Sequence, residues 1–135
     1  MIKKNFHFLI MGIVALFIVY GFIISGVNSK RLIKYTKYTT AIIVSDWHHK
    51  NNNGVGVDYE YYVNGKSYEF TINLNLTENE KYLLAYDSLK PSNCQILEIY
   101  PLNKNIISPM NGWNLNEIPI RVNSGEVFNY IKEIK

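Results

Sequence analysis

A chain of 135 residues has room for one ordinary domain, and 47% hydrophobic residues would by themselves suggest a well-filled globule. The charges are divided unevenly: residues 1–38 carry six basic residues and no acid, whereas residues 39–135 carry eight basic residues against all eleven acids, a balance of −3. The larger part of the chain therefore lacks the positive surface that nucleic-acid binding requires, and we expect no nucleic-acid partner.

The first predicted element is the apolar segment 6–27, which has no charged residue if His7 is neutral. A helix of this length, at about 1.5 Å per residue, crosses a hydrocarbon core of about 30 Å. A cleaved secretory signal is the alternative, because Lys3 and Lys4 precede the segment and small residues follow it. The apolar run is longer than a usual signal core and no A-x-A triplet follows it. We therefore expect an uncleaved single-pass transmembrane helix after a short tail, residues 1–5.

A basic segment, residues 28–38, comes next and is expected to be a juxtamembrane tether. The residues predicted to lie at the membrane interface flank the helix on both sides: Lys3, Lys4, Lys30, Arg31, Lys34 and Lys37. Because these charges nearly balance across the bilayer, the positive-inside rule leaves the orientation close to a tie. A short tail with two lysines resembles a signal anchor, so we expect the C-terminal domain outside the cytoplasm. The basic residues after the helix would then lie beside anionic headgroups of the lipid bilayer.

The stretch VGVDYEYYVNGKSYEFTI, residues 55–72, predicts a β-hairpin. Asn64-Gly65 is typical of a type I′ turn, which needs positive φ at both central residues. Pairing Val63 with Lys66 then places apolar pairs on one face of the ribbon: Tyr61 with Tyr68, Tyr59 with Phe70, and Val57 with Ile72. The opposite face pairs Tyr62 with Ser67, Glu60 with Glu69, and Asp58 with Thr71, and is expected to be solvated. The single apolar face indicates a core surface of a half-buried sheet rather than a base-stacking surface.

Further strands are expected on both sides of the hairpin. We predict strands at 39–48, 81–87 and 94–100, with a turn at 88–93 and a stop at Pro101. The 39–135 domain is therefore expected to be a small antiparallel meander of five or six strands, similar to a barrel. Its end, VFNYIKEIK, has apolar residues at helical spacing behind Asn123 or Ser124, which indicates a short C-terminal helix, while IPIRV is the alternative site of a sixth strand.

The hairpin motif, read with a second motif downstream, resembles a group of small bacterial membrane-anchored proteins of unknown function. Their pattern has an N-terminal helix, a Y-x-F/Y-x-V-N-G-K-x-Y strand, then V-x-Y, a proline-containing turn and I-L-x-L. The matching residues here are Tyr59, Tyr61, Val63, Asn64, Gly65, Lys66, Tyr68, Tyr86, Pro91, Ile96 and Leu97. Ser88-Leu89-Lys90 departs from the pattern and suggests a longer loop. The resemblance implies a fold and an anchor, and it implies no activity.

Few residues suggest chemistry. His48, His49 and Asp46 are the types that bind metals, but adjacent strand residues point to opposite faces and no third ligand is evident, so no metal or other cofactor is expected. Cys94 is expected to be a buried structural thiol, because it has no second cysteine to pair with. Glu60 and Glu69 face each other on a surface expected to be solvated, which disfavours acid/base catalysis.

The function expected from these patterns is therefore non-catalytic. We expect a membrane-anchored β-domain that binds another protein of the bacterial envelope, as an assembly subunit or an immunity-type protein. The richness in Asn, Lys, Ile and Tyr is typical of an AT-rich bacterial genome, and the cytoplasmic (inner) membrane is the expected location. The alternative is a ligand-binding or enzymatic domain whose site is built from loop residues such as His48, His49, Asn111 and Trp113.

Overall fold

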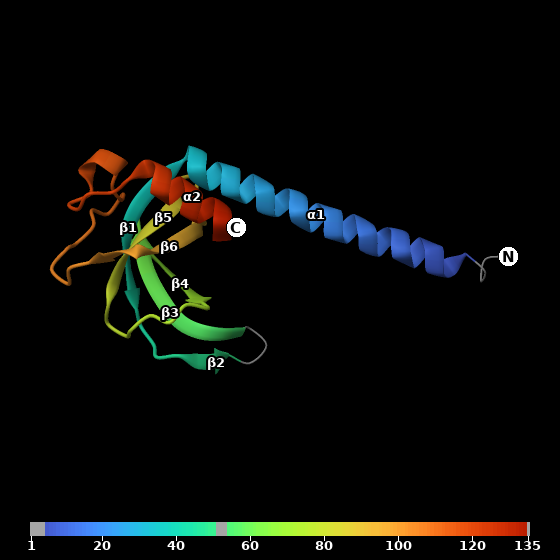
Figure 1. The fold of residues 1–135 in the computed structure, drawn as a ribbon, viewed down its shortest axis with the longest axis horizontal. Helices are drawn as coiled ribbons and strands as arrows, with labels where there is room; N and C mark the ends of the chain where they lie inside the picture. Colours follow the sequence, from blue (N-terminus) through green and yellow to red (C-terminus); the bar gives the residue numbers. More distant parts are fainter. Residues whose placement is uncertain (1–4, 51–53, 135) are drawn as a thin grey trace.

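A computed structural model describes residues 5–50 and 54–134. Figure 1 shows a long helix that projects from a curved sheet, with a short second helix beside the base of the first. The elements in chain order are α1 (Phe6–Lys34), β1 (Thr36–Ile43), β2 (His48–Lys50), β3 (Gly54–Val63), β4 (Lys66–Ile72), β5 (Lys81–Asp87), β6 (Lys90–Leu102), the 3₁₀ helix η2 (Leu115–Glu117) and α2 (Ser124–Ile134). The predicted interface residues Lys3 and Lys4 lie outside the described residues.

Helix α1 is long and apolar enough to span a membrane. Its most apolar window has a mean hydropathy of 2.7, and none of that window is buried against the rest of the protein. A helix that is apolar all round and exposed to solvent on every side is suited to lipid. The helix ends at Lys34, beyond the predicted end at residue 27. The segment predicted as a tether is therefore divided between the last turns of α1 and the start of β1.

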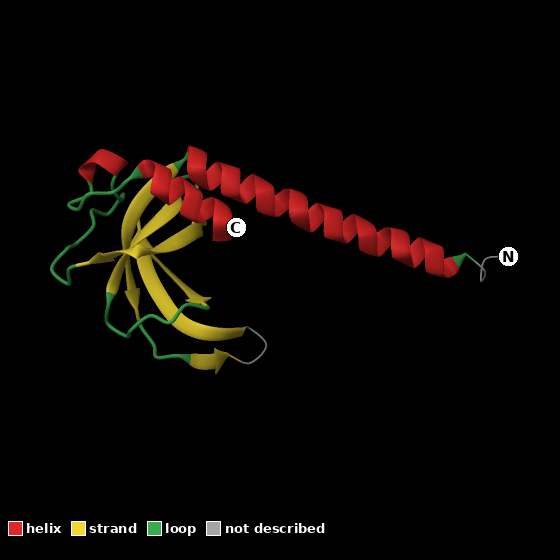
Figure 2. Ribbon diagram, in the orientation of Figure 1, coloured by secondary structure: helices red, strands yellow, loops and turns green. Residues whose placement is uncertain are grey.

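All the pairs of described strands are antiparallel, and together they form one six-stranded sheet. Five of the strands are hydrogen-bonded neighbours in the order β2-β3-β1-β5-β6, and the sixth, β4, pairs with β3. The strands curl into an open half-barrel (Figure 2). The predicted fold class is thus confirmed: one N-terminal apolar helix, an antiparallel sheet of six strands and a short C-terminal helix. The sixth strand is β2 rather than IPIRV, which has no strand in the structure.

The predicted hairpin register is confirmed at every pair from Val63↔Lys66 to Val57↔Ile72. Asn64 and Gly65 both have positive φ, 52° and 79°, as the predicted turn requires. The backbone N–H of Asn64 also donates a hydrogen bond to the backbone carbonyl of Met110 over 2.7 Å. The turn residues are therefore structural, because they set the register of the hairpin and also hold the C-terminal segment.

The connection between β5 and β6 is tighter than predicted. Asp87 pairs with Lys90, and the Asp87 carboxylate accepts the backbone N–H groups of Leu89 at 2.8 Å and Lys90 at 3.3 Å. β6 therefore begins inside the segment predicted as a turn, and it continues through Pro101. The prolines are tolerated because β6 is an edge strand that pairs only with β5 among the described strands, and because both prolines lie at register shifts of that pairing.

Each face of the sheet carries its own core. The helix-side core joins the end of α1 and helix α2 to the sheet: Leu32, Tyr38, Leu83, Ala85, Leu97, Leu102, Trp113, Ile118, Val127 and Ile131. The barrel-side core fills the concave side of the curl: Ala41, Ile43, Val57, Tyr59, Tyr61, Val63, Leu76, Leu84, Tyr86 and Ile96. At the start of helix α2, the Asn123 side chain accepts hydrogen bonds from the backbone N–H groups of Gly125 and Glu126. Of the two predicted N-cap residues, Asn123 and Ser124, Asn123 is therefore the N-cap.

Candidate functional site

The junction between α1 and the sheet is the first candidate site, because it fixes the domain relative to the helix that is long and apolar enough to span a membrane. Leu32, in the last turn of α1, is fully buried in the helix-side core. Arg31 reaches the fully buried Asp87 at the end of β5, with 3.3 Å between Nε and Oδ2, an ion pair without the alignment of a hydrogen bond. Asn93 of β6 donates to the carbonyl of Asn28 over 2.8 Å. The last turns of α1 are thus part of the β-domain.

The predicted interface residues that the structure describes do not act as one group. Arg31 is held by Asp87, and the Lys37 ammonium donates to the carbonyl of Asn111 over 2.8 Å. Lys30 and Lys34 remain exposed on the last turns of α1. The sequence pattern alone could not distinguish the basic residues that bind groups of the domain from those that remain exposed, because the binding partners lie far away in the chain.

The outer edge of the half-barrel carries a cluster of aromatic rings, the second candidate site. The ring of Tyr61 stacks on that of Tyr68 with 5.2 Å between centroids, and Tyr59 and Phe70 lie 6.2 and 6.3 Å from the Tyr61 ring. Tyr59 and Tyr61 are buried as predicted, whereas Tyr68 is half-buried and Phe70 is 37% exposed. The prediction that all four are core was thus wrong for Phe70, because β4 pairs with β3 on one side and has no described strand on its other side.

The buried phenols bridge the hollow of the half-barrel. The Tyr61 hydroxyl donates to the carbonyl of Pro91 on β6 over 2.7 Å, and the Tyr59 hydroxyl lies 3.5 Å from the Cys94 sulfur. Burial raises the pKa of both phenols well above the ordinary value, and the nearby Cys94 thiol raises it further. Cys94 itself is half-buried rather than buried as predicted. The contacts of the two phenols join the two sides of the curl, and the raised pKa keeps both phenols protonated at any physiological pH.

A polar cluster lies on the face of the hairpin that the sequence predicted to be solvated. Asp58 is buried, lies 3.4 Å from the His48 ring nitrogen Nε2, and accepts the hydroxyl of Thr71 at 2.5 Å. Its backbone N–H donates to the Ser45 hydroxyl over 2.9 Å. The prediction failed for Asp58 because the connection from β1 to β2 folds over this end of β3. The alternation of polar residues in the hairpin contains no signal of that distant contact.

No metal-binding group of three or more His, Cys, Asp or Glu side chains occurs among the described residues. His48 uses its other ring nitrogen on the Asp46 carbonyl, 2.8 Å away, so Asp46 contributes backbone rather than carboxylate to it. The loop residues of the alternative site are also separated. Trp113 pairs with Tyr38 near the start of β1, whereas His48 follows the end of β1, roughly 17 Å further along the strand at about 3.3 Å per residue.

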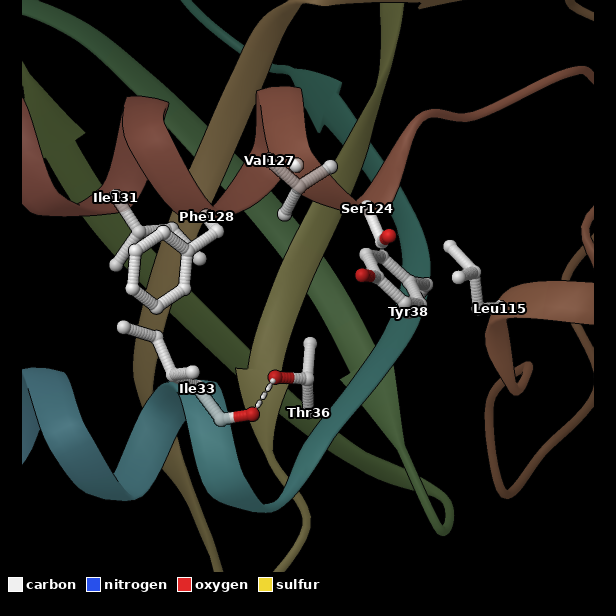
Figure 3. A pocket seen from close by; sticks show the side chains of 9 residues that line it. Ile33, Thr36, Tyr38, Leu115, Ser124, Val127, Phe128 and Ile131 are labelled. Carbon is white, nitrogen blue, oxygen red and sulfur yellow. Dashed lines mark hydrogen bonds between the residues drawn. The ribbon is translucent and has the colours of Figure 1, made fainter.

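A cavity of about 470 Å³ lies between the end of α1, the start of β1 and helix α2. Figure 3 shows Phe128 and Ile131 reaching down from α2 toward Ile33, and Thr36 donating its hydroxyl to the Ile33 carbonyl at 2.9 Å. The lining is mostly apolar and contains no carboxylate, histidine or lysine. The cavity can accommodate apolar groups, and the polar side chains of its lining are the hydroxyl-bearing Thr36, Tyr38 and Ser124.

Comparisons with known proteins found no matching family model, no matching curated protein and no matching solved structure. The resemblance to the small membrane-anchored group therefore stays a prediction.

Proposed function

We propose that the protein is a non-catalytic, membrane-anchored domain that binds another protein of the bacterial envelope, and that the partner adds a strand to the outer edge of β4. It would serve as an assembly subunit or as an immunity-type protein, with the β-domain outside the cytoplasm. The observation that supports this most strongly is the open edge of β4 beside a half-exposed aromatic face.

The described strands leave three open edges on the sheet, at β2, β4 and β6, and these edges are protected to different degrees. Exposed edges invite pairing with other chains, and proteins discourage this by short edge strands, prolines or charges. β2 is only three residues long, and β6 carries Pro91 and Pro101. β4 has seven residues and no proline, and Lys66 and Glu69 are its charged residues. β4 is therefore the edge that is best suited to accept a partner strand.

The register determines which amides of β4 a partner can use. In a two-residue hairpin the pair next to the turn is hydrogen-bonded, and bonded and non-bonded pairs then alternate. Tyr68 and Phe70 consequently bond to β3, whereas the N–H groups of Ser67, Glu69 and Thr71 point away from it. No backbone bond to these three amides from outside the hairpin occurs in the described part of the chain.

Side chains on the concave side of β4 would give the contact selectivity. Phe70 and the half-buried Tyr68 extend the aromatic cluster to the edge, so a partner strand with apolar residues at alternate positions would cover them. The balance of −3 in residues 39–135 favours a basic partner, because complementary charge increases the rate of encounter.

Site-specific crosslinking in cells tests this proposal. A photoreactive amino acid replaces Ser67 in the full-length protein, which then carries either Glu69→Pro or Glu69→Ala. Both substitutions remove the Glu69 carboxylate. Proline also removes the outward N–H of residue 69 and leaves the bonds to β3 in place, whereas alanine keeps that N–H. We expect one crosslinked partner with Glu69→Ala, and its loss with Glu69→Pro.

A second photoreactive position, at the exposed Asn116 in η2, controls for contacts of the surface in general. Melting curves of both Glu69 variants must agree, which shows that the fold is retained. The same crosslinked band in both variants, or an equal band from Asn116, would exclude strand addition at β4.

A further inference from the structure

A groove between the last turns of α1 and helix α2 combines an apolar wall with basic side chains. Its volume is about 470 Å³, and its lining residues are Gly26, Ser29, Lys30, Ile33, Lys34, Phe128 and Lys132. Two of its lysines come from α1 and one from α2, so the basic group exists only after the fold has brought the two helices together. The two helices lie side by side in Figure 1 and Figure 2.

The positive charges of the groove are not neutralised by the described part of the protein. Lys30, Lys34 and Lys132 take part in no ion pair with a described residue, and the lining contains no carboxylate. The Lys34 ammonium lies 5.2 Å from the centre of the Tyr35 ring, and that of Lys132 lies 5.7 Å from the centre of the Phe128 ring. Three cations in one groove, with no internal counter-charge, suit an anionic ligand.

The position of the groove on α1 identifies the source of that anion. Gly26 lies within the apolar segment 6–27, and Lys30 and Lys34 follow its end by roughly 5 and 10 Å at about 1.5 Å per residue. The headgroup region adds about 5–8 Å to each side of the hydrocarbon core. The groove therefore begins at the edge of the hydrocarbon, passes Lys30 among the headgroups and ends with Lys34 at their outer boundary. Phe128, 42% exposed, supplies an apolar side chain to its lining.

We propose that this groove binds one anionic phospholipid, with its phosphate among Lys30, Lys34 and Lys132 and the start of an acyl chain between Phe128 and Gly26. A general attraction of lysines to an anionic surface needs no groove and would treat every exposed cation alike. The lipid site differs because it requires Lys132 and Phe128 of α2, which are about a hundred residues away from Lys30 in the chain.

Native mass spectrometry of the full-length protein tests the site. The protein is released from detergent micelles that contain equal amounts of phosphatidylglycerol and phosphatidylcholine, and retained lipid is counted. We expect one retained phosphatidylglycerol. The variant Lys34→Gln/Lys132→Gln should bind it about twenty-five-fold more weakly, since each lysine near an anionic headgroup contributes about fivefold.

The control variant Lys104→Gln/Arg121→Gln removes the same charge from two exposed positions outside the groove and should keep the lipid. Phe128→Ser, with every lysine intact, should also weaken retention, whereas inorganic phosphate should not displace the lipid. Equal loss in both charge variants, no preference for phosphatidylglycerol in the unchanged protein, or displacement by phosphate would overturn the proposal.

Discussion

The substitution Leu32→Ala tests whether the end of α1 is an integral part of the β-domain. Leu32 is fully buried and packs in the helix-side core with Tyr38, Leu83 and Ile131. Truncation of a buried leucine to alanine costs about 2–5 kcal/mol, because apolar contact is lost and a cavity remains. A loss of 3 kcal/mol would lower the melting temperature of a domain of this size by roughly 12–24 °C.

The assay is thermal unfolding of the full-length protein in detergent, followed by tryptophan fluorescence. Trp113 is buried in the same core as Leu32 and reports directly on that packing. Leu89→Ala is the matched control, because Leu89 is 64% exposed in the β5–β6 turn and its truncation should cost within about 0.5 kcal/mol. Equal melting temperatures for the two variants would show that α1 is a separate anchor and that the junction is not part of the core.

Two further predictions concern the aromatic cluster. Tyr61→Ala should lower the free energy of unfolding by about 3–5 kcal/mol, because Tyr61 is fully buried, whereas Tyr62→Ala on the exposed face should lower it by no more than about 1 kcal/mol. Similar losses for the two variants in urea titrations would contradict the assignment of the two faces. Burial raises the pKa of Tyr61 in the folded state above 10.0, so its contribution to stability is fully present below pH 10 and is lost as the pH rises beyond that value. Tyrosinate absorbance should therefore show a set of phenols that ionise only as the domain unfolds, and full ionisation in the folded domain would refute this.

The features that could be predicted from the sequence are those that local rules determine. Asn64-Gly65 sets the turn, and the alternation of apolar and polar residues on both sides of it sets the register, so the predicted register of the hairpin is confirmed at every pair. The strand at 81–87 and the helix behind Asn123 follow from the same kind of local pattern.

The features that could not be predicted depend on contacts between distant parts of the chain. The ion pair between Arg31 of α1 and Asp87 of β5 is one such contact, and no local pattern around Arg31 indicates it. Asp58 was assigned to solvent because nothing in the hairpin shows that the β1–β2 connection covers it. Pro91 indicates a turn unless one knows that β6 is an edge strand. The groove lysines are likewise brought together only when α2 packs against α1.

Hydrogen exchange at individual amides of β4 tests the proposed strand addition most directly. In the unbound full-length protein, the N–H groups of Tyr68 and Phe70 should exchange slowly because they bond to β3, whereas those of Ser67, Glu69 and Thr71 should exchange rapidly. In the complex isolated with the crosslinked partner, all five should exchange slowly. Continued rapid exchange at Ser67, Glu69 and Thr71 in that complex would contradict the account, because a partner that adds a strand must bond to those amides.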